Sequence, residues 1–447
     1  MYNCDRHFYL TLFFIEFVFN FSLCYLVINF VLKFIETNSW DYCSDTLFTH
    51  ILLVSVVIQF NTKMGLLLDK SAPYADRHRQ SFFRRFEYFK LGTKQVSVRY
   101  GRIFFMILFI ILVYWIFMSL FSDDKTTNCY KYPFDGAISS ALSSITYFKD
   151  ILDAKKQPTS GKAIFFHETS CHPNGIAKLN AKQACAIESA AHLNPNRDIF
   201  VIFASPVGIN DYENLPPYID MLWKYENIHF RNIDLWRYSK DTPGEAWINT
   251  NKLFQSNYLY EHMSDYLRVL TLYKFGGFYL DLDVVVQKNF DDLGEDFVVD
   301  DWSTVLATSI MHLNNDGIGW EIATEYLERL TKNFDGNVFI ANGPKILTQT
   351  CADICDTEQR SLWTREKCVG LDLKRKQQFH PIQWRDYMMY FDVDKLNKTL
   401  ELSKNSTMIH VWNDRSSHIS NKVGTNNAYQ VIAAKNCPSV YASSEYF

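Results

Sequence analysis

One uncharged run limits the architecture of this chain more than any other feature. Residues Ile103–Phe121 read IFFMILFIILVYWIFMSLF and contain no charged side chain. As a helix with a rise of about 1.5 Å per residue, the run extends roughly 28 Å, which matches the hydrocarbon core of a bilayer. A buried core helix is the alternative, but so uniformly apolar a run with aromatic residues throughout favours a membrane. The run therefore predicts a transmembrane segment at 103–121.

The charges on either side of this run predict its direction. Asp123 and Asp124 follow it, and many basic residues precede it. Positive charge concentrates on the cytosolic side of a membrane segment, so residues 1–102 are predicted to be a cytosolic tail and the residues after 121 to be luminal. The run lies too far from the start, and is too long, for a cleaved signal peptide. The basic residues are Arg77, Arg79, Arg84, Arg85, Lys90, Lys94, Arg99 and Arg102.

Residues 1–63 allow two interpretations. The apolar stretches 8–32 and 46–60 could add two membrane spans, although Glu16 is costly in the first and the second is short. Alternatively, translation begins at Met64, which leaves a basic tail of ordinary length. Both interpretations stay open at this point.

Cysteines concentrate in the predicted luminal part. Disulfides are expected there because the lumen is oxidising, and the odd number of thiols leaves at least one free or paired between chains. The spacing of Cys351 and Cys355 also suggests zinc, but no second Cys or His pair lies at the usual spacing, so zinc is disfavoured. The seven cysteines after residue 121 are Cys129, Cys171, Cys185, Cys351, Cys355, Cys368 and Cys437.

The luminal part is expected to divide into a polar stem, 122–160, and a folded domain, 161–447. Short apolar runs alternate with helical patterns, which predicts a parallel sheet with helices on its faces. Ligands bind such sheets at the carboxyl ends of the strands. The chain has no GxGxxG or Walker sequence, and a net charge of −4 gives no reason to expect nucleic acid. Expected strands are 163–166, 198–204 and 228–233, and expected helices are 174–193 and 217–225.

The segment 258–286 carries the residues suited to chemistry. Residues 258–275 predict a helix that ends at Gly276 and Gly277, because glycine is favoured at helix C-termini. Asp265 and Arg268 are three residues apart and share a helix face. The residues FYLDLDVVV, 278–286, then predict one strand. Its alternation places Tyr279, Asp281 and Asp283 on the same side.

Asp281 and Asp283 suit a divalent metal. On one strand face their Cα atoms would lie about 7 Å apart. Two buried carboxylates repel each other unless a cation lies between them, and oxygen ligands suit Mg²⁺ or Mn²⁺. Such a cation also binds a diphosphate and stabilises the charge on a departing nucleotide. The plain alternative is a strand that ends in solvent, and an isolated DxD does not exclude it.

The wider sequence around these acids resembles a known family. Residues 264–283, SDYLRVLTLYKFGGFYLDLD, match the pattern S-D-x-x-R-x-x-x-L-x-x-x-G-G-x-Y-x-D-x-D of sugar-nucleotide transferases. From about residue 163 to 447 the chain resembles the α1,4-glycosyltransferase family, and its insect members in particular. Further matching pieces are IFFHETS (164–170), ACAIESAA (184–191), NPNRDIFVIFASP (194–206), HFRNIDLWRY (229–238), NGP (342–344), QWRDY (383–387), HVWN (410–413) and NCP (436–438).

The resemblance implies a GT-A-type α/β domain that retains the anomeric configuration and uses a UDP-sugar with Mn²⁺ or Mg²⁺. Asp283 would bind the metal directly, and Asp281 would contact the metal, the ribose or the donor sugar. Asp265 and Arg268 would hold hydroxyls of the donor sugar, and Arg268 could also reach the diphosphate. A surface ion pair worth roughly 0.3–0.5 kcal/mol is the plain alternative for that pair.

Other nucleotide contacts follow from the same resemblance. Gly276 and Gly277 would let the backbone approach the nucleotide, unless they only cap the helix. Tyr279 belongs to the same expected site. His410 would ligate the metal or donate to phosphate, or else it is an ordinary core histidine. Trp412 and Asn413 would close the nucleotide site beside it.

The part of the chain after about residue 310 is expected to complete the site and the acceptor cleft. Asn342 and Gly343 would lie near the acceptor, although NGP is more often only a turn. Trp384 and Asp386 would offer the acceptor sugar an aromatic platform and a hydroxyl-binding group, unless Trp384 is a core residue.

Two further features bear on the luminal assignment. Asn397 and Asn405 begin N-x-S/T sequences and are expected to carry glycans. The Cys355–Cys368 pairing is expected to close a surface loop.

The expected activity is transfer of galactose from UDP-galactose, in α1,4 linkage, onto a glycosphingolipid such as lactosylceramide. The expected setting is the Golgi membrane, with one span and a luminal domain. N-acetylgalactosamine or N-acetylglucosamine as donor sugar, and an inactive lectin or partner chaperone, are the alternatives; homo- or hetero-oligomers are left open. No residue stands out as a nucleophile, since neither Asp265 nor Glu168 can be placed, so front-face transfer is favoured.

Overall fold

The computed structural model describes residues 106, 109–113, 125–131 and 145–447. The chain divides into two units, Met1–Ser122 and Asp123–Phe447. Residues 1–63 and most of the predicted span 103–121 lie outside the described residues. Among the residues that are described, no helix is both long and apolar enough to traverse a bilayer. The description below concerns the second unit.

A seven-stranded mixed sheet forms the centre of this unit. Strands β2 (Ile164–Glu168), β3 (Ile199–Phe203), β5 (Ile228–Asn232) and β6 (Gly277–Leu280) are parallel to one another. Strand β9 (Ala307–Leu313) runs antiparallel to β6 and to β8 (Phe297–Val299), and β10 (Asp372–Lys374) pairs with β8 in parallel. The strand order is β10-β8-β9-β6-β2-β3-β5. The predicted α/β class is therefore confirmed, but the sheet is mixed rather than parallel throughout, because β9 runs antiparallel to β6 and β8.

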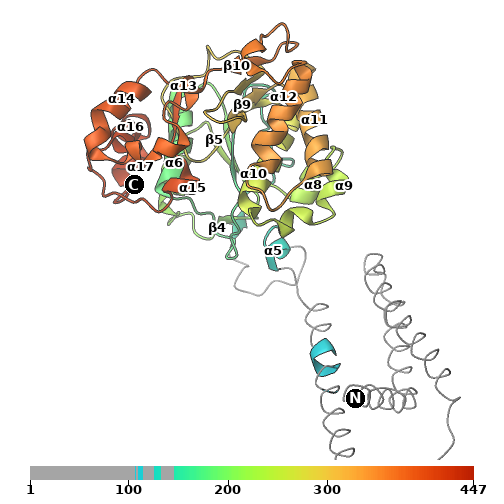
Figure 1. Cartoon of the computed structure of the whole chain (residues 1–447). Coiled ribbons are helices and arrows are strands. Elements are labelled where there is room, and N and C mark those ends of the chain that lie inside the picture. Colours follow the sequence, from blue (N-terminus) through green and yellow to red (C-terminus); the bar gives the residue numbers. More distant parts are fainter. Residues whose placement is uncertain (1–105, 107–108, 114–124, 132–144) are drawn as a thin grey trace, which may run out of the picture. The chain divides into compact units, whose positions relative to one another are not determined.

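Helices cover both faces of the sheet (Figure 1). On one side lie α6 (Ala181–Leu193), α7 (Pro217–Trp223), α16 (Ala428–Asn436) and α17 (Pro438–Ser443), and on the other α10 (Leu259–Phe275), α11 (Gly317–Asn333) and α12 (Ile346–Ile354). Side chains alternate along β2. Ile164 and Phe166 therefore enter the hydrophobic core on one face of the sheet, and Phe165 enters the core on the other face. The buried, continuously apolar strands of the sequence are explained by these two helical layers.

Two predicted elements differ from the structure. Helix α6 begins at Ala181 rather than near residue 174, because the Asn180 side chain accepts from the Gln183 N–H and the Gln183 side chain accepts from the Asn180 N–H. The single strand expected at 278–286 is two strands, β6 and β7 (Val284–Val286), separated by the Asp281–Asp283 turn. Strand β7 leaves the main sheet and pairs antiparallel with β11 (Met408–His410).

Part of the expected stem is folded onto the domain. Strand β1 (Thr146–Tyr147) pairs with β4 (Gly208–Ile209), and Ile151 is completely buried. The Asn232 side chain donates to the carbonyl of Phe148 at 3.0 Å, so the segment is fixed at the edge of the sheet beside β5. Residues 145–160 therefore belong to the core unit rather than to a linker.

Three disulfides lie in the described part of the chain. The predicted Cys355–Cys368 bond is confirmed, which removes Cys355 as a zinc ligand. Cys129 pairs with Cys171, and Cys185 pairs with Cys437. Cys351 is the free, buried thiol among the described residues, as the odd count required.

Candidate active site

Gly276 and Gly277 form the turn between α10 and β6, where neighbouring chain segments pack too closely to leave room for a side chain. Gly276 caps α10 with φ 62°, and its N–H donates to Leu272. A Cβ on Gly277 would lie 2.5 Å from the carbonyl oxygen of Ala163, and one on Gly276 would lie 2.6 Å from the amide nitrogen of Asn315. Both glycines lie at the opposite end of β6 from Asp281. Their expected contact with the nucleotide stays a prediction.

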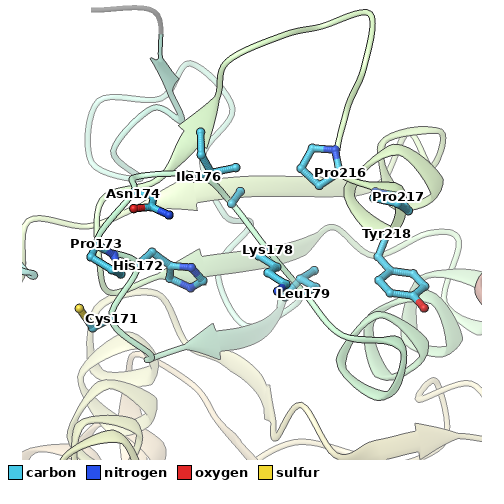
Figure 2. Close-up of a pocket in the computed structure, with 11 residues that line it drawn as sticks. Cys171, His172, Pro173, Asn174, Ile176, Lys178, Leu179, Pro216, Pro217 and Tyr218 are labelled. Atoms are coloured by element: carbon cyan, nitrogen blue, oxygen red, sulfur yellow. The ribbon is translucent and has the colours of Figure 1, made fainter. Parts of the chain in front are cut away.

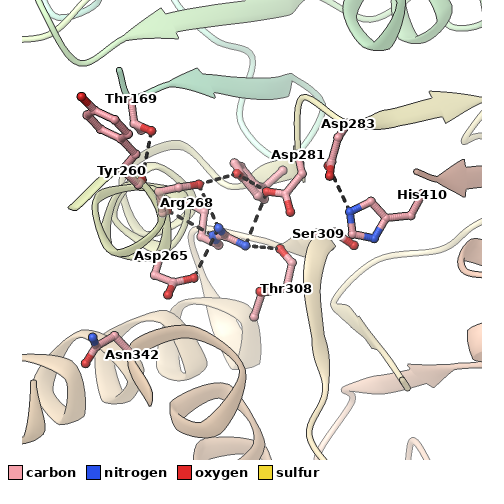
Figure 3. A network of polar contacts seen from close by, with 12 residues as sticks. Thr169, Tyr260, Asp265, Arg268, Asp281, Asp283, Thr308, Ser309, Asn342 and His410 are labelled. Carbon is pink, nitrogen blue, oxygen red and sulfur yellow. Dashed lines mark hydrogen bonds and ion pairs between the residues drawn. The ribbon is translucent and has the colours of Figure 1, made fainter. Parts of the chain in front are cut away.

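Arg268 is a buried cation held from several directions. Its guanidinium donates to the Thr308 carbonyl at 2.7 Å and to the Ser264 hydroxyl at 2.8 Å. It also lies 3.3 Å from a carboxylate oxygen of Asp265 and 3.5 Å from one of Asp281 (Figure 3). Asp265 and Arg268 are each only 5% exposed, so they are not the surface ion pair that was the alternative. The guanidinium instead links α10 to the first acid of the DxD motif.

Asp281 is fixed by its neighbours on two strands. Its N–H donates to the Ser309 carbonyl at 2.9 Å, which continues the β6–β9 ladder for one more residue. The Tyr279 hydroxyl donates to the Asp281 carboxylate at 2.5 Å and lies 2.8 Å from the Ser264 hydroxyl. The Asp281 carboxylate is thus oriented by Tyr279, which Ser264 holds in turn.

Asp283 faces a different set of partners. One oxygen lies 3.0 Å from Nε2 of His410 (Figure 3). The other oxygen accepts from the Asn413 N–H at 2.7 Å. Asp281, Asp283 and His410 each offer a ligand atom, and these atoms lie within 4.8 Å of one another. Asn413 begins α15 (Asn413–Ser416), and Trp412 precedes it with a left-handed φ of 56°. His410 and Asn413 therefore lie at Asp283, while metal binding by His410 and closure of the nucleotide site by Trp412 and Asn413 stay predictions.

Burial and nearby charges shift the pKa values of the three acids in different directions. Burial raises the pKa of Asp265 to about 7 despite the nearby Arg268 guanidinium. Burial likewise raises the pKa of Asp281. For Asp283, burial is outweighed by the charge and hydrogen bond of His410, which lower its pKa. Burial would lower the pKa of His410, but the Asp283 carboxylate raises it.

Gly343 lies directly against the Asp265 carboxylate. A Cβ at Gly343 would lie 2.1 Å from an Asp265 oxygen, so no larger residue fits without moving that carboxylate. The Asn342 side chain faces away, donating to the Asp335 carbonyl and accepting from the Asp335 N–H. Asn342 therefore closes a loop, and it is Gly343 that borders the site.

The Trp384 side chain is half-buried beside α15. The guanidinium carbons of Arg385 and Arg415 each lie 5.0 Å from the centre of its ring. Arg415 belongs to α15, and the Trp412 indole N–H donates to the carbonyl of Ile382, close to Trp384 in the chain. Asp386 is exposed and accepts from the Gln383 amide. Trp384 thus lies near the site, while its contact with an acceptor stays a prediction.

Lys182 is a buried cation that the sequence analysis missed. Its ammonium donates to the carbonyls of Ser416 and Ile419 at 2.8 and 2.9 Å. It thereby joins α6 to the end of α15, whose first residue holds Asp283. Burial lowers the pKa of Lys182 to about 8. Nothing in the local sequence AKQACAI distinguishes this lysine from an exposed one.

A cavity lies at the carboxyl edge of the sheet beyond β2 (Figure 2). Its volume is 560 Å³, and its walls come from the segment 171–179 and from the start of α7. His172 lines it, and its Nε2 is hydrogen-bonded to the carboxylate of Glu168, the last residue of β2. Glu168 also accepts from the Ser170 N–H at 3.1 Å, so its carboxylate is already engaged.

Ser264 is a further site residue that was quoted in the motif but given no role. Its hydroxyl joins Tyr279 and Arg268, and its carbonyl accepts from Nε of Arg268 at 3.1 Å. The S-D-x-x-R spacing was the available signal, because positions four apart share a helix face.

The predicted glycan acceptors Asn397 and Asn405 are both exposed.

Two family profiles match consecutive parts of this domain. The "glycosyltransferase sugar-binding region containing DXD motif" matches residues 180–299, and the "alpha 1,4-glycosyltransferase conserved region" matches residues 316–444. Between them they contain the DxD acids, Gly343 and His410.

Curated relatives agree with these profiles. Human lactosylceramide 4-alpha-galactosyltransferase is 28% identical over 297 residues, covering 65% of this chain and 79% of that protein. The mouse protein of the same name is 26% identical over 290 residues, covering 64% and 76%. Human alpha-1,4-N-acetylglucosaminyltransferase is 25% identical over 313 residues, covering 68% and 86%.

Similar solved structures are more distant. The PaToxG glycosyltransferase gives a TM-score of 0.33 at 18% identity, over 48% of this chain and 72% of its own. The galactosyltransferase LgtC, bound to donor and acceptor sugar analogues, gives 0.29 at 11%, over 63% and 95%. These scores are too low to support an argument of their own. The two profiles and the curated relatives show that the chain is a glycosyltransferase and that it is similar to the α1,4-glycosyltransferase family.

Proposed function

We propose that this enzyme transfers galactose from UDP-galactose, in α1,4 linkage and with retention of configuration, to a glycosphingolipid such as lactosylceramide. The observation that carries the proposal is the meeting of Asp281, Asp283 and His410 at the carboxyl edge of the sheet, beside the Arg268–Asp265 pair. The Golgi membrane is the proposed location.

The donor set at this edge fits a divalent metal. Two carboxylates and one imidazole converge within 4.8 Å, and Nδ1 of His410 is buried without a hydrogen-bond partner among the described residues. Oxygen ligands suit both Mg²⁺ and Mn²⁺, whereas an imidazole ligand is more usual for transition metals. Mn²⁺ is therefore the proposed ion, and when bound it would neutralise the diphosphate of the donor.

The residues of the chain itself would position the donor sugar. Arg268 cannot move freely, because Ser264, Thr308 and two carboxylates hold its guanidinium. Asp265 is buried and borders the site through Gly343. An oriented carboxyl group with a raised pKa can donate a hydrogen bond to a sugar hydroxyl when it is protonated, or accept one from it when it is ionised. Such positioning reduces the entropy that the transfer step must otherwise lose.

The cavity of 560 Å³ beyond β2 is the proposed place of the nucleoside. Its size falls in the range of small-molecule sites, and apolar walls with a few polar groups suit a flat heterocycle. His172 connects this cavity to the carboxyl end of β2, the neighbour of β6. A UDP-sugar lying along this edge would place its diphosphate at Asp281 and Asp283.

Front-face transfer is the proposed mechanism. Asp265 is a poor nucleophile because Arg268 already engages its carboxylate and burial raises its pKa to about 7, and Glu168 is engaged by His172 and Ser170. The leaving phosphate would then accept the proton of the acceptor hydroxyl on the same face as the departing bond. Detection of a covalent glycosyl-enzyme adduct by mass spectrometry would contradict this mechanism.

The direct test is an assay of the full chain with Mn²⁺. UDP-galactose, UDP-N-acetylgalactosamine and UDP-N-acetylglucosamine are each offered with lactosylceramide and with an N-acetylglucosaminyl glycolipid. Transfer of galactose to lactosylceramide is expected. Transfer of either N-acetylated sugar alone would assign the alternative donor, and release of no UDP with any pair would refute the proposal.

A further inference from the structure

Four apolar side chains beside the active site face solvent. Val338, Phe339 and Ile340 are consecutive and 38%, 40% and 38% exposed, and Tyr260 on the first turn of α10 is 48% exposed. We call these four residues the apolar rim. Solvent exposure of several neighbouring large apolar groups is unfavourable unless another surface covers them.

The apolar rim is held firmly next to the site. The Phe339 carbonyl lies 3.3 Å from Nε2 of His262, and the Phe339 ring lies edge-on to Tyr258 with 5.5 Å between ring centres. Gly343, which touches Asp265, follows Ile340 by three residues. A surface that covers the rim would therefore also lie close to the donor-sugar residues.

The beginning of the folded unit is anchored at the same place. Cys129 is bonded to Cys171, and the Tyr130 hydroxyl donates to the Thr169 carbonyl at 2.9 Å. The Thr169 hydroxyl donates in turn to the carbonyl of Tyr260 at 2.9 Å. The chain thus enters the domain next to the apolar rim.

Chain length then limits the separation of this edge from the predicted membrane segment. Only eight peptide units connect Phe121 to Cys129. Fully extended, they reach at most about 28 Å. If residues 103–121 span a bilayer, a connection of this length would keep Cys129 within about 28 Å of the end of that span.

We propose that the apolar rim rests on the surface of the lipid bilayer that holds the chain, so that the active site receives acceptors carried by that same membrane. Aromatic and aliphatic side chains on a rigid edge favour the interfacial region of a bilayer. This inference depends on the predicted membrane segment and on the proposed function, whose glycolipid acceptor it places. It also gives a reason for apolar residues at a position that would otherwise contact only water.

The test compares two valines of similar exposure. Val338→Asp changes the rim, and Val431→Asp changes a valine that is 40% exposed on α16, a helix that packs on α6 and α17. The full chain is reconstituted into phosphatidylcholine vesicles with lactosylceramide, and lactose in solution serves as the membrane-free acceptor. Val338→Asp is expected to lower transfer to lactosylceramide about fivefold, from the lost burial of one side chain, and to leave transfer to lactose unchanged. Val431→Asp is expected to change neither rate.

Equal loss on both acceptors, or no loss on either, would overturn the inference. A second measurement does not need enzyme activity, so that it separates this inference from the proposed function. Val338→Cys and Val431→Cys are labelled with a polarity-sensitive fluorophore in the same vesicles, and other thiols contribute equally to both. A blue-shifted emission that only the Val338→Cys protein shows supports the rim, and identical spectra refute it even if no acceptor is found.

Discussion

The Asp265–Arg268 pair and the Asp281–Asp283–His410 group differ in how their charges are balanced. The pair on α10 is 5% exposed and contains its own cation. In the group at the sheet edge, Asp281 and Asp283 have side chains that are 25% and 16% exposed, and Arg268 reaches only the first of them. The Asp265 carboxylate is thus balanced by a buried guanidinium, whereas Asp281 and Asp283 lie closer to solvent, where the metal that we propose would bind.

The largest expected effect comes from removing the charges of the edge group. Replacing both Asp281 and Asp283 with asparagine is expected to lower kcat by about 10³-fold or more, because the metal can no longer stabilise the leaving diphosphate. Mn²⁺ binding measured by electron paramagnetic resonance should fall with it. Asp291→Asn, at a 66% exposed side chain, is the control. Unchanged turnover in the double variant would remove the edge group from the mechanism.

A pH effect on stability tests the other half of the comparison. Because the folded pKa of Asp265, about 7, exceeds its ordinary value of 3.8, the folded state holds this proton more tightly than the unfolded state does. Its contribution is therefore complete below about pH 4 and is lost as the pH rises toward 7, by at most about 4 kcal/mol.

Urea unfolding at pH 5 and pH 7, with chelator and without donor, measures this effect. The loss of unfolding free energy between the two pH values should be smaller for Asp265→Asn than for the unaltered chain. An identical loss in both proteins would show that Arg268 keeps Asp265 ionised in the folded state.

Arg268→Lys sharpens the comparison by keeping the charge and removing the geometry. Lysine cannot contact Ser264, Thr308 and two carboxylates at once. We expect kcat/KM for the donor to fall about 100-fold, with Mn²⁺ affinity changed much less. A parallel loss of Mn²⁺ affinity would mean that the two groups act as one.

Gly343→Ala should disturb only the sugar side. The added Cβ would meet Asp265 at 2.1 Å and displace its carboxylate. KM for the donor is expected to rise about tenfold, as for loss of one well-placed polar contact. Gly317→Ala, whose Cβ meets no atom within 4 Å although its φ is 52°, is the control for a glycine-to-alanine change away from Asp265 in the same kinetic assay. Similar KM values for the two variants would argue against the Asp265 contact.

The smallest effect is expected at Lys182. Lys182→Met removes the two hydrogen bonds that connect α6 to the end of α15. Because Lys182 acts on Asp283 only through α15, Mn²⁺ affinity should weaken about threefold, less than the roughly tenfold or greater loss expected for a group that contacts a metal ligand directly. Lys224→Met, at an exposed lysine on the surface, provides the matched calorimetric control. Equal Mn²⁺ affinity in both variants would make Lys182 a purely structural residue.

The sequence predicted the parts of this domain that depend on local pattern. The apolar runs of β2, β3 and β5, and the end of α10 at Gly276, follow from alternation, burial and capping. The Asp265–Arg268 pair and the DxD acids were likewise found from spacing. These features need no information from distant parts of the chain.

What the sequence did not predict depends on distant contacts. The strand expected over 278–286 breaks because β7 pairs with β11, more than a hundred residues later. The contact of Gly343 with Asp265 and the burial of Lys182 against Ser416 arise in the same way. No periodicity within one segment encodes such partners.

The break between β6 and β7 places the two acids of the DxD motif on separate β-sheets. Asp281 continues the main sheet, whereas Asp283 begins the two-stranded ribbon of β7 and β11 that also presents His410. An ion bound by all three residues would crosslink the ribbon to the main sheet. Nucleotide affinity and the rigidity of the carboxyl-terminal region would then depend on the same ion. Without the metal, the enzyme would be more flexible in that region as well as inactive.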